Sequence, residues 1–312
     1  MAIARDNPIG VFDSGAGGLT VVRTLLQRLP DERVVYFGDT GYVPYGPRPP
    51  EEIRRFAVDA CRFLRAHDVK LIVMGCNMSS AMALEDARGV AGCPVLGTID
   101  AGARAAVAAT RNGRIGVAAT EGTVRSGAYE RAVKAVRPEA QVFQHPCPLL
   151  VPAVEAGVQD GLLVDAVAES LEPLRDHAPD TVILGCTHYP LVRDEIQSFL
   201  GGEVRLIDPA EMLAEQAAEE LQARDLLATA TGFQSRARSP ESTGTASGSQ
   251  SRVQSPESTA TASGSETRPT VRQHDRVVEC YASGPADSLR AWGLRVLGID
   301  LGFVEQVDIH RA

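Results

Sequence analysis

The chain has 312 residues, enough for two ordinary domains, and carries a formal charge of −9. An acidic chain lacks the positive field that attracts phosphate polyanions, so nucleic acid is not expected as a partner. No apolar run approaches the roughly 20 residues that cross a bilayer, and residues 1–8 contain no apolar signal core, so we expect a cytoplasmic protein with no membrane partner.

The cysteines are expected to be reduced thiols. A chain of this length without a secretion signal does not read as a disulfide framework. No two cysteines form a Cys-x-x-Cys pair, so we expect no structural metal site. Most buried thiols are inert, so a reactive role has to be argued from the neighbours of each one. The six cysteines are Cys61, Cys76, Cys93, Cys147, Cys186 and Cys280.

Residues 1–210 alternate short apolar runs with amphipathic stretches, the pattern of repeated strand–helix units. The expected strands are Ile9–Asp13, Arg33–Gly38, Lys70–Gly75, Cys93–Gly97, Arg114–Ala119, Gln141–His145, Thr181–Gly185 and Glu203–Ile207. The expected helices include Leu19–Leu29, Pro50–His67, Ser79–Arg88, Ala101–Arg111, Arg125–Val136 and Gly161–His177. Because strands joined by helices pair in parallel, the predicted fold class is α/β, with mostly parallel sheets flanked by helices.

A segment of different composition, residues 231–273, interrupts this pattern. It consists mainly of Ser, Thr, Gly, Ala, Pro and Gln, and it has too few large apolar residues for a core, so we expect a disordered insertion. Within it a 16-residue unit at 234–249 is repeated in tandem at 250–265. Phosphorylation or partner binding at its Ser-Pro steps is one interpretation, and a neutral expansion is the favoured one.

The apolar pattern resumes after this insertion, at Arg276–Ser283, in a helical stretch at Asp287–Leu297 and at Phe303–Ile309. These residues are too few for a domain, so we expect them to complete the sheet of the N-terminal half. The predicted N-terminal domain comprises residues 1–98, 208–230 and 274–312, and the predicted second domain comprises residues 99–207.

Three glycines follow the first expected strand, in the segment Asp13–Gly18. Glycines let the backbone approach a ligand closely, and the helix start at Leu19 offers unpaired N–H groups to an anion. Asp13 and Ser14 are therefore candidate ligand-binding residues. The alternative is a tight turn in which one of them caps the helix.

Two similar segments follow two other expected strands, at Met74–Ala81 and Leu184–Val192. In each, Gly-Cys is followed by a small polar residue, and Cys76 and Cys186 lie 110 positions apart (186 minus 76). This spacing favours two similar domains whose strand ends face one cleft, where open α/β sheets place their ligands. A thiol at a strand end beside a helix start is expected to be reactive; a small buried hydrophobe is the alternative.

Each of these two cysteines has a residue that can exchange a proton with it. His188, two residues after Cys186, can share a proton with that thiol and raise its thiolate fraction. Asp13 can do the corresponding job for Cys76 as a carboxylate that accepts or orients a proton.

A stretch rich in Pro, Gly and Tyr, Gly38–Pro50, is predicted to form a preformed loop. Tyr45 and Gly46 offer a phenol and a close backbone approach to a pocket. A surface loop with a packed tyrosine is the alternative.

Taken together, VFDSGAGGLTV, DTGYVPYG, GCNMSSA, GVAATEGTVRSGAY and ILGCTHYPL resemble the signature segments of bacterial glutamate racemases, in the same order and at similar spacing. The resemblance covers about residues 8–210 well, the last part of the chain loosely and the insertion not at all. It implies two α/β domains around a central cleft and an isomerase that uses no pyridoxal phosphate, metal or nucleotide. It also implies a role in supplying D-glutamate for bacterial peptidoglycan.

The resemblance assigns the paired acid and base to Cys76 and Cys186, with Asp13 assisting the first and His188 the second. Glu155 matches a carboxylate position near the second cysteine. The expected partner is a small acidic amino acid, and the sequence leaves open whether two copies form a homodimer. The segments that would hold the substrate's amino and carboxylate groups contain Asp13, Ser14, Tyr45, Gly46, Asn77, Met78, Thr120, Thr123, Thr187 and His188.

One residue departs from the family pattern: Met78 stands where the family usually carries a threonine. A thioether cannot donate a hydrogen bond, so either the Met78 backbone N–H suffices or the pocket contacts differ. Aspartate or another acidic amino acid is therefore an alternative substrate. From another class, an inactive ligand-sensing or inhibitory binding protein on the same fold is an alternative. A metal enzyme is disfavoured, because Cys-x-His with one distant cysteine leaves a site short of ligands.

Overall fold

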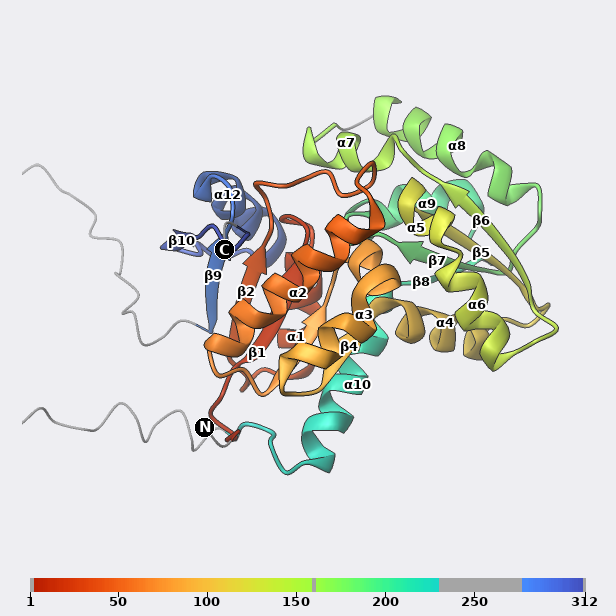
Figure 1. The fold of residues 1–312 in the computed structure, drawn as a ribbon. Helices are drawn as coiled ribbons and strands as arrows, with labels where there is room; N and C mark the ends of the chain where they lie inside the picture. Colours follow the sequence, from red (N-terminus) through yellow and green to blue (C-terminus); the bar gives the residue numbers. More distant parts are fainter. Residues whose placement is uncertain (1–2, 159–160, 230–276, 311–312) are drawn as a thin grey trace, which may run out of the picture.

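The computed structural model describes residues 3–158, 161–229 and 277–310, and the strands of these residues form two sheets (Figure 1). The larger sheet has the strand order β10-β9-β2-β1-β3-β4, and the smaller has the order β6-β5-β7-β8. All the paired strands run parallel. The predicted α/β class, with parallel sheets flanked by helices, is confirmed.

Every expected strand of residues 1–210 is present, with ends that differ by at most two residues. The larger sheet comprises β1 (Ile9–Asp13), β2 (Val34–Gly38), β3 (Leu71–Met74), β4 (Val95–Gly97), β9 (Val278–Ala282) and β10 (Val304–Gln306). The smaller comprises β5 (Arg114–Ala119), β6 (Gln141–Pro146), β7 (Thr181–Gly185) and β8 (Arg205–Ile207).

Helices cover both faces of the larger sheet, so successive residues of its central strands are buried on opposite sides. In β1, Val11 belongs to the core under α1 and α12, whereas Phe12 belongs to the core under α2 and α3. This double burial explains why the strand has no exposed position. The helices concerned are α1 (Leu19–Arg28), α2 (Pro50–Ala66), α3 (Asn77–Ala91) and α12 (Ala286–Leu297).

The smaller sheet is built in the same way. Val117 and Ile183 join the core that includes residues of α4 and α6, whereas Val182 and Leu184 join the core that includes residues of α8 and α9. The helices of this part are α4 (Thr98–Ala109), α5 (Glu121–Ser126), α6 (Ala128–Val136), α7 (Leu150–Glu155), α8 (Gly161–Arg175) and α9 (Arg193–Leu200), with a short 3-10 turn, η1 (Tyr189–Val192).

One expected helix, Arg125–Val136, is wrong as a single element. The chain forms α5 and α6 instead, separated at Gly127, whose φ of 62° lies in the left-handed region. A glycine adopts this conformation without steric cost, and it ends one helix and begins the next.

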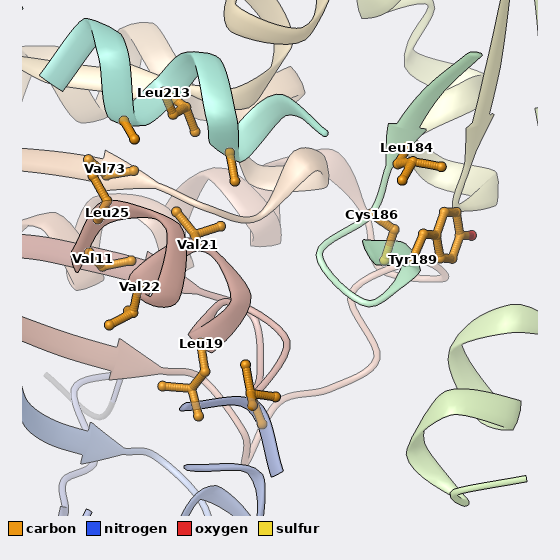
Figure 2. Close-up of a cluster of buried hydrophobic side chains, with 14 of the residues drawn as sticks. Val11, Leu19, Val21, Val22, Leu25, Val73, Leu184, Cys186, Tyr189 and Leu213 are labelled. Carbon is orange, nitrogen blue, oxygen red and sulfur yellow. The ribbon is translucent and has the colours of Figure 1, made fainter. Parts of the chain in front are cut away.

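A further helix, α10 (Pro209–Ala223), connects the two parts of the structure. Asp208 caps it by accepting a hydrogen bond from the Ala210 backbone N–H at 2.9 Å, and Pro209 begins its first turn. Leu213 of α10 lies beside Leu25 and Val73 (Figure 2), in one buried cluster that also contains Leu184. Both sheets therefore contribute to one core.

The residues that follow the Ser- and Thr-rich segment add two strands to the larger sheet. β9 pairs with β2 in the register Val34↔Val278, and β10 pairs with β9 at the sheet edge (Figure 1). The division of the chain into two domains stays a prediction, and the repeat-containing insertion at 231–273 lies outside the described residues. None of the helices in the described ranges is long and apolar enough to span a bilayer.

A buried ion pair lies just before two strands of the larger sheet. The Lys70 ammonium is fully buried, lies 2.6 Å from a Glu32 carboxylate oxygen, and donates to the backbone carbonyl of Leu226 at 2.9 Å. Glu32 also accepts a hydrogen bond from the Ala228 backbone N–H at 2.9 Å. Burial lowers the pKa of Lys70, and Glu32 opposes this effect.

We expect Lys70→Met to lower the free energy of unfolding by about 3–5 kcal/mol, because it leaves the Glu32 carboxylate buried without its cation. Urea denaturation followed by circular dichroism measures this change. Arg28→Met is the matched control, since its pair with Glu215 is about half exposed and should contribute less than about 1 kcal/mol. Equal losses in the two variants would contradict the interpretation.

Candidate functional site

The candidate residues follow the carboxyl ends of parallel strands from both sheets. β1 ends at Asp13 and β3 is followed by Cys76, while in the other sheet β5 is followed by Thr120 and β7 by Cys186. Parallel pairing puts the ends of neighbouring strands at one edge of each sheet, so each sheet presents a cysteine at such an edge.

The glycine loop after β1 packs directly against the segment that follows β7. Thr20, in the first turn of α1, donates its hydroxyl to the Thr187 backbone carbonyl at 2.9 Å. A Cβ atom at Gly17 would lie 2.5 Å from the Thr187 hydroxyl oxygen and 2.6 Å from the His188 ring. Only glycine fits here, and the two sheets meet at this loop.

Asp13 lies at this meeting point and is 1% exposed. Its carboxylate accepts hydrogen bonds from the Gly15 backbone N–H at 3.0 Å and from the Thr187 hydroxyl at 3.3 Å. Burial raises the pKa of Asp13 to about 6, and the nearby charge of His188 and these hydrogen bonds limit the rise. A carboxyl group with such a pKa can gain or lose a proton near neutrality.

Cys76 caps the N-terminus of α3. Its sulfur accepts a hydrogen bond from the Ser79 backbone N–H at 3.4 Å and lies 3.5 Å from the Ser14 hydroxyl oxygen. Burial, followed by the negative charge of Asp13, raises the pKa of the Cys76 thiol to about 11, and Ser14 and Ser79 oppose the rise. The thiol form is therefore the resting form of Cys76 at neutral pH.

Cys186 has a different environment, because it faces a histidine. The His188 Nδ1 atom lies 3.7 Å from the Cys186 sulfur, and its Nε2 atom lies 3.1 Å from a Glu155 carboxylate oxygen. Burial alone would lower the pKa of His188, but its hydrogen bonds with Cys186 and Glu155 and the charge of Asp13 raise it to about 10. Cys186 thus lies beside a ring that is cationic at neutral pH.

The asparagine and threonine candidates lie at the starts of the helices that follow β3 and β5: Asn77 and Thr123 are buried, and Thr120 is partly buried. Asn77 begins α3 and accepts a hydrogen bond from the Tyr129 hydroxyl at 2.5 Å. The hydroxyl oxygens of Thr120 and Thr123 lie 3.0 Å apart at the start of α5. Each of these polar groups therefore already makes a hydrogen bond within the protein.

Met78 forms a close contact between α3 and α5. A Cβ atom at Gly122 would lie 2.1 Å from the Met78 methyl carbon and 2.4 Å from its sulfur. The thioether thus fills the space that the missing side chain of Gly122 leaves open. The sequence indicated only a lost hydroxyl at this position, whereas the structure shows a packing role.

The loop that carries Tyr45 and Gly46 is anchored on both sides. The Tyr45 hydroxyl donates to Asp39 at 2.5 Å, and the Arg125 guanidinium of α5 donates to the Gly46 backbone carbonyl at 3.2 Å. Burial, followed by the charge of Asp39, raises the pKa of Tyr45 well above its usual range. Tyr45 is therefore a neutral hydroxyl donor.

The sequence interpretation missed His310, which lies beneath this loop. Its Nε2 atom is 3.0 Å from Asp39 and its Nδ1 atom is 3.1 Å from Asp59, and its ring lies against Tyr42 and Phe56. A histidine separated by more than two hundred residues from its partners gives no local sequence signal. Burial lowers the pKa of His310, and the two carboxylates raise it to a value above the usual one.

Two surface cavities of about 480 and 600 Å³ lie in other places. The first is lined by residues around β8 and α9, and the second by residues of α2, α3, α4 and α6. Neither is lined by Cys76 or Cys186. In the described part of the chain, no group of three or more His, Cys, Asp and Glu side chains is arranged to hold a metal ion.

Comparisons with known proteins agree on one family. A family model described as Asp/Glu/Hydantoin racemase matches residues 9–217. The glutamate racemase of Geobacter metallireducens is 47% identical over 220 residues, which is 70% of this chain and 82% of that protein. The crystal structure of glutamate racemase isoform RacE1 from Bacillus anthracis superposes with a TM-score of 0.79 at 32% identity, covering 97% of this chain and 98% of that one. The Francisella tularensis glutamate racemase, solved in complex with D-glutamate, superposes with a TM-score of 0.77 at 29% identity, covering 98% of both chains.

We expect Gly18→Ala to lower the free energy of unfolding by about 1–3 kcal/mol, because its Cβ would lie 2.4 Å from the Asp13 Cβ atom, which cannot swing away. Urea denaturation measures the change. Gly89→Ala is the matched control: it lies within α3 with open space around it, so alanine should stabilise by about 0.5–1 kcal/mol. A neutral Gly18→Ala would show that the loop is not tightly packed.

We expect the stabilising effect of His310 to depend on pH. A histidine whose pKa is raised on folding stabilises fully below its unfolded pKa of about 6.5, and it loses this contribution as pH rises through the folded value. The difference in unfolding free energy between the unchanged protein and His310→Gln should therefore be larger at pH 6 than in alkaline solution. In the Asp59→Asn background this difference should shrink, and a pH-independent difference would contradict the ion pairs.

Proposed function

This chain belongs to the Asp/Glu/Hydantoin racemase family, and we propose that it inverts the Cα of glutamate with Cys76 and Cys186 as its two proton-transferring groups. It is an isomerase, a glutamate racemase, like the relatives it matches over most of its length. The observation that supports the assignment of the cysteines is that one loop contacts both Cys76 and Thr187, the residue next to Cys186. Asp13 and Ser14 are consecutive residues of this loop. Ser14 lies beside Cys76, and Asp13 accepts a hydrogen bond from the Thr187 hydroxyl.

The chemistry needs two single-proton groups on opposite faces of one carbon. In one direction the Cys186 thiolate takes the Cα proton, the electron pair is left on a flat, carbanion-like carbon, and the Cys76 thiol gives its proton to the other face. The reverse direction exchanges the two roles. Positioned acid–base groups of this kind contribute about 10²–10⁴-fold each.

The two helper groups differ in charge, and each suits the cysteine beside it. The cationic His188 ring stabilises a Cys186 thiolate, and Glu155 keeps that ring cationic. Asp13, with a pKa of about 6, lies close enough to oppose a negative charge on Cys76 and can relay its proton. We infer that Cys76 carries the proton in the resting protein.

The substrate's charged ends would meet polar groups that are already held in place. The start of α3 offers backbone N–H groups, which stabilise the negative charge of a carboxylate as it grows during proton removal. We propose that Ser14, Asn77, Thr120, Thr123 and Thr187, with Tyr45 and Gly46, hold the amino and carboxylate groups. Met78 would bound the pocket with its side chain and contribute its backbone N–H.

The product and its setting follow from the same assignment. We propose that the protein works without a cofactor in a bacterial cytoplasm and supplies D-glutamate for peptidoglycan. Association of two copies into a homodimer stays a prediction. Aspartate is the alternative substrate, because the thioether of Met78 changes the pocket wall where the family usually has a hydroxyl.

The test follows Cα deuterium by NMR when L- or D-glutamate is incubated in D₂O with the protein and no cofactor. The unchanged protein should exchange the Cα proton of both enantiomers. Cys76→Ala and Cys186→Ala should each abolish racemisation, with a loss of at least about 10²-fold, because one face of the carbon then has no proton donor.

Cys93→Ala is the matched control, since this partly buried thiol precedes β4 whereas Cys76 follows the parallel strand β3, so the two lie at opposite edges of the larger sheet and exchange should be unchanged. Full racemisation by either of the two site variants would contradict the assignment of the cysteines. Exchange of aspartate but not glutamate would overturn the substrate and leave the mechanism in place.

A further inference from the structure

We propose that Arg295 of α12 is a positioning residue, which holds the end of α7 so that Glu155 reaches His188 and supports the Cys186 half of the reaction. This inference rests on the proposed function. It concerns a helix that packs on α1 and the larger sheet, whereas Glu155, His188 and Cys186 belong to the other half of the chain. The orientation of Glu155 and His188 would thus be set by α12, a helix that packs on the other sheet.

The first contact joins Arg295 to the residue before Glu155. An Arg295 guanidinium nitrogen (Nη1) donates to the Val154 backbone carbonyl at 2.7 Å. Val154 lies in the last turn of α7, where a cation is favoured, and its carbonyl also accepts the Gly157 backbone N–H at 3.1 Å. A charge-assisted hydrogen bond of this length is roughly twice as strong as a neutral one. It fixes the backbone from which the Glu155 side chain extends.

The second contact joins the same face of α12 to His188. Trp292 precedes Arg295 by three residues, so both side chains lie on one side of the helix. The Trp292 ring lies 5.1 Å from the His188 ring at an interplanar angle of 77°, and the Arg295 guanidinium lies 5.4 Å from the Trp292 ring centre. One helix face therefore contacts the His188 ring directly and the backbone of Val154, the residue before Glu155.

The pair needs such support because Glu155 is poorly enclosed. Its side chain is 52% exposed, and it extends from a helix of only six residues. A short helix is marginal by itself, and an exposed carboxylate has several rotamers of similar energy. Anchoring at Val154 restricts where the Glu155 carboxylate can lie, and this favours the 3.1 Å contact with His188.

A pH profile separates positioning from a purely structural role. The titratable groups that face His188 are Cys186, Glu155 and Asp13, and the bond to Glu155 is one reason why the pKa of His188 is raised to about 10. If Glu155 no longer reaches the ring, that pKa falls. The alkaline limb of kcat then moves to lower pH, since His188 loses its proton earlier.

Isotope effects report which half of the reaction is slowed. L- and D-glutamate have equal free energy in water, so every variant must change kcat/KM equally in the two directions. A slower proton transfer at Cys186 nevertheless changes which step limits the rate. Cleavage of the Cα–H bond becomes more rate-limiting for the enantiomer that Cys186 deprotonates, and less rate-limiting for the enantiomer that Cys76 deprotonates. The primary isotope effect of Cα-deuterated substrate should rise for one enantiomer and fall for the other.

The experiment compares Arg295→Ala and Arg295→Lys with Arg290→Ala, in the full chain and with both glutamate enantiomers. Arg290 lies on the same helix but bonds the Gly302 carbonyl and Asp287, so it controls for general damage to α12. Arg295→Ala should lower kcat about tenfold, shift the alkaline limb and split the isotope effects. Arg295→Lys should recover part of the rate, because a cation stays at the end of α7.

A double variant completes the test. In a Glu155→Ala background, Arg295→Ala should cause little further loss of kcat, because the contact that it supports is already gone. Additive losses, or a loss in Arg290→Ala equal to that in Arg295→Ala, would overturn the positioning role. An unshifted alkaline limb would also overturn it. If Cys186→Ala racemises normally, the proposed function fails instead, whatever these variants do.

Discussion

The buried carboxylate of Asp13 is the constraint on which the rest of the site depends. It is 1% exposed, yet it lies where the ends of two sheets meet, and it accepts one backbone N–H and the hydroxyl of Thr187. Burial of a charge is costly, which is why the pKa of Asp13 rises to about 6 although its hydrogen bonds and the charge of His188 limit the rise. The glycines after it are needed because any Cβ at Gly17 or Gly18 would collide with this arrangement.

The hydrophobic core holds the two sheets together where their strand ends meet. One buried cluster includes Val11 of the larger sheet, Leu184 of the smaller sheet and Leu213 of α10 (Figure 2). Close-packed interiors resist small displacements, so the ends of β1 and β7 keep their positions relative to each other. The loop from β1 and the segment from β7 can therefore share hydrogen bonds of about 3 Å although they are far apart in the chain.

The strands, and the placement of Cys76 and Cys186 just after two of them, could be predicted because their signals are local. A strand buried on both faces is a continuous apolar run, and a Gly-Cys step at its end marks the carboxyl edge of a parallel sheet. Trp292 and His310 could not be predicted, because they reach the site from beyond residues 230–276 and owe their positions to the pairing of β9 with β2. α10 was not among the expected helices although Asp208 and Pro209 form a helix start, since its buried face consists largely of alanines, which give a weak apolar signal.

The two cysteines have opposite electrostatic surroundings, although the reaction that we assign to them is symmetric. Cys76 faces the carboxylate of Asp13, whereas Cys186 faces a His188 ring that is cationic at neutral pH. Such a difference favours a protonated Cys76 in the free protein, and under the proposed mechanism this thiol delivers the proton to one enantiomer. Because the two enantiomers have equal free energies, the asymmetry cannot favour one product at equilibrium. It can only make kcat and KM differ between the two enantiomers, while the ratio kcat/KM stays the same for both.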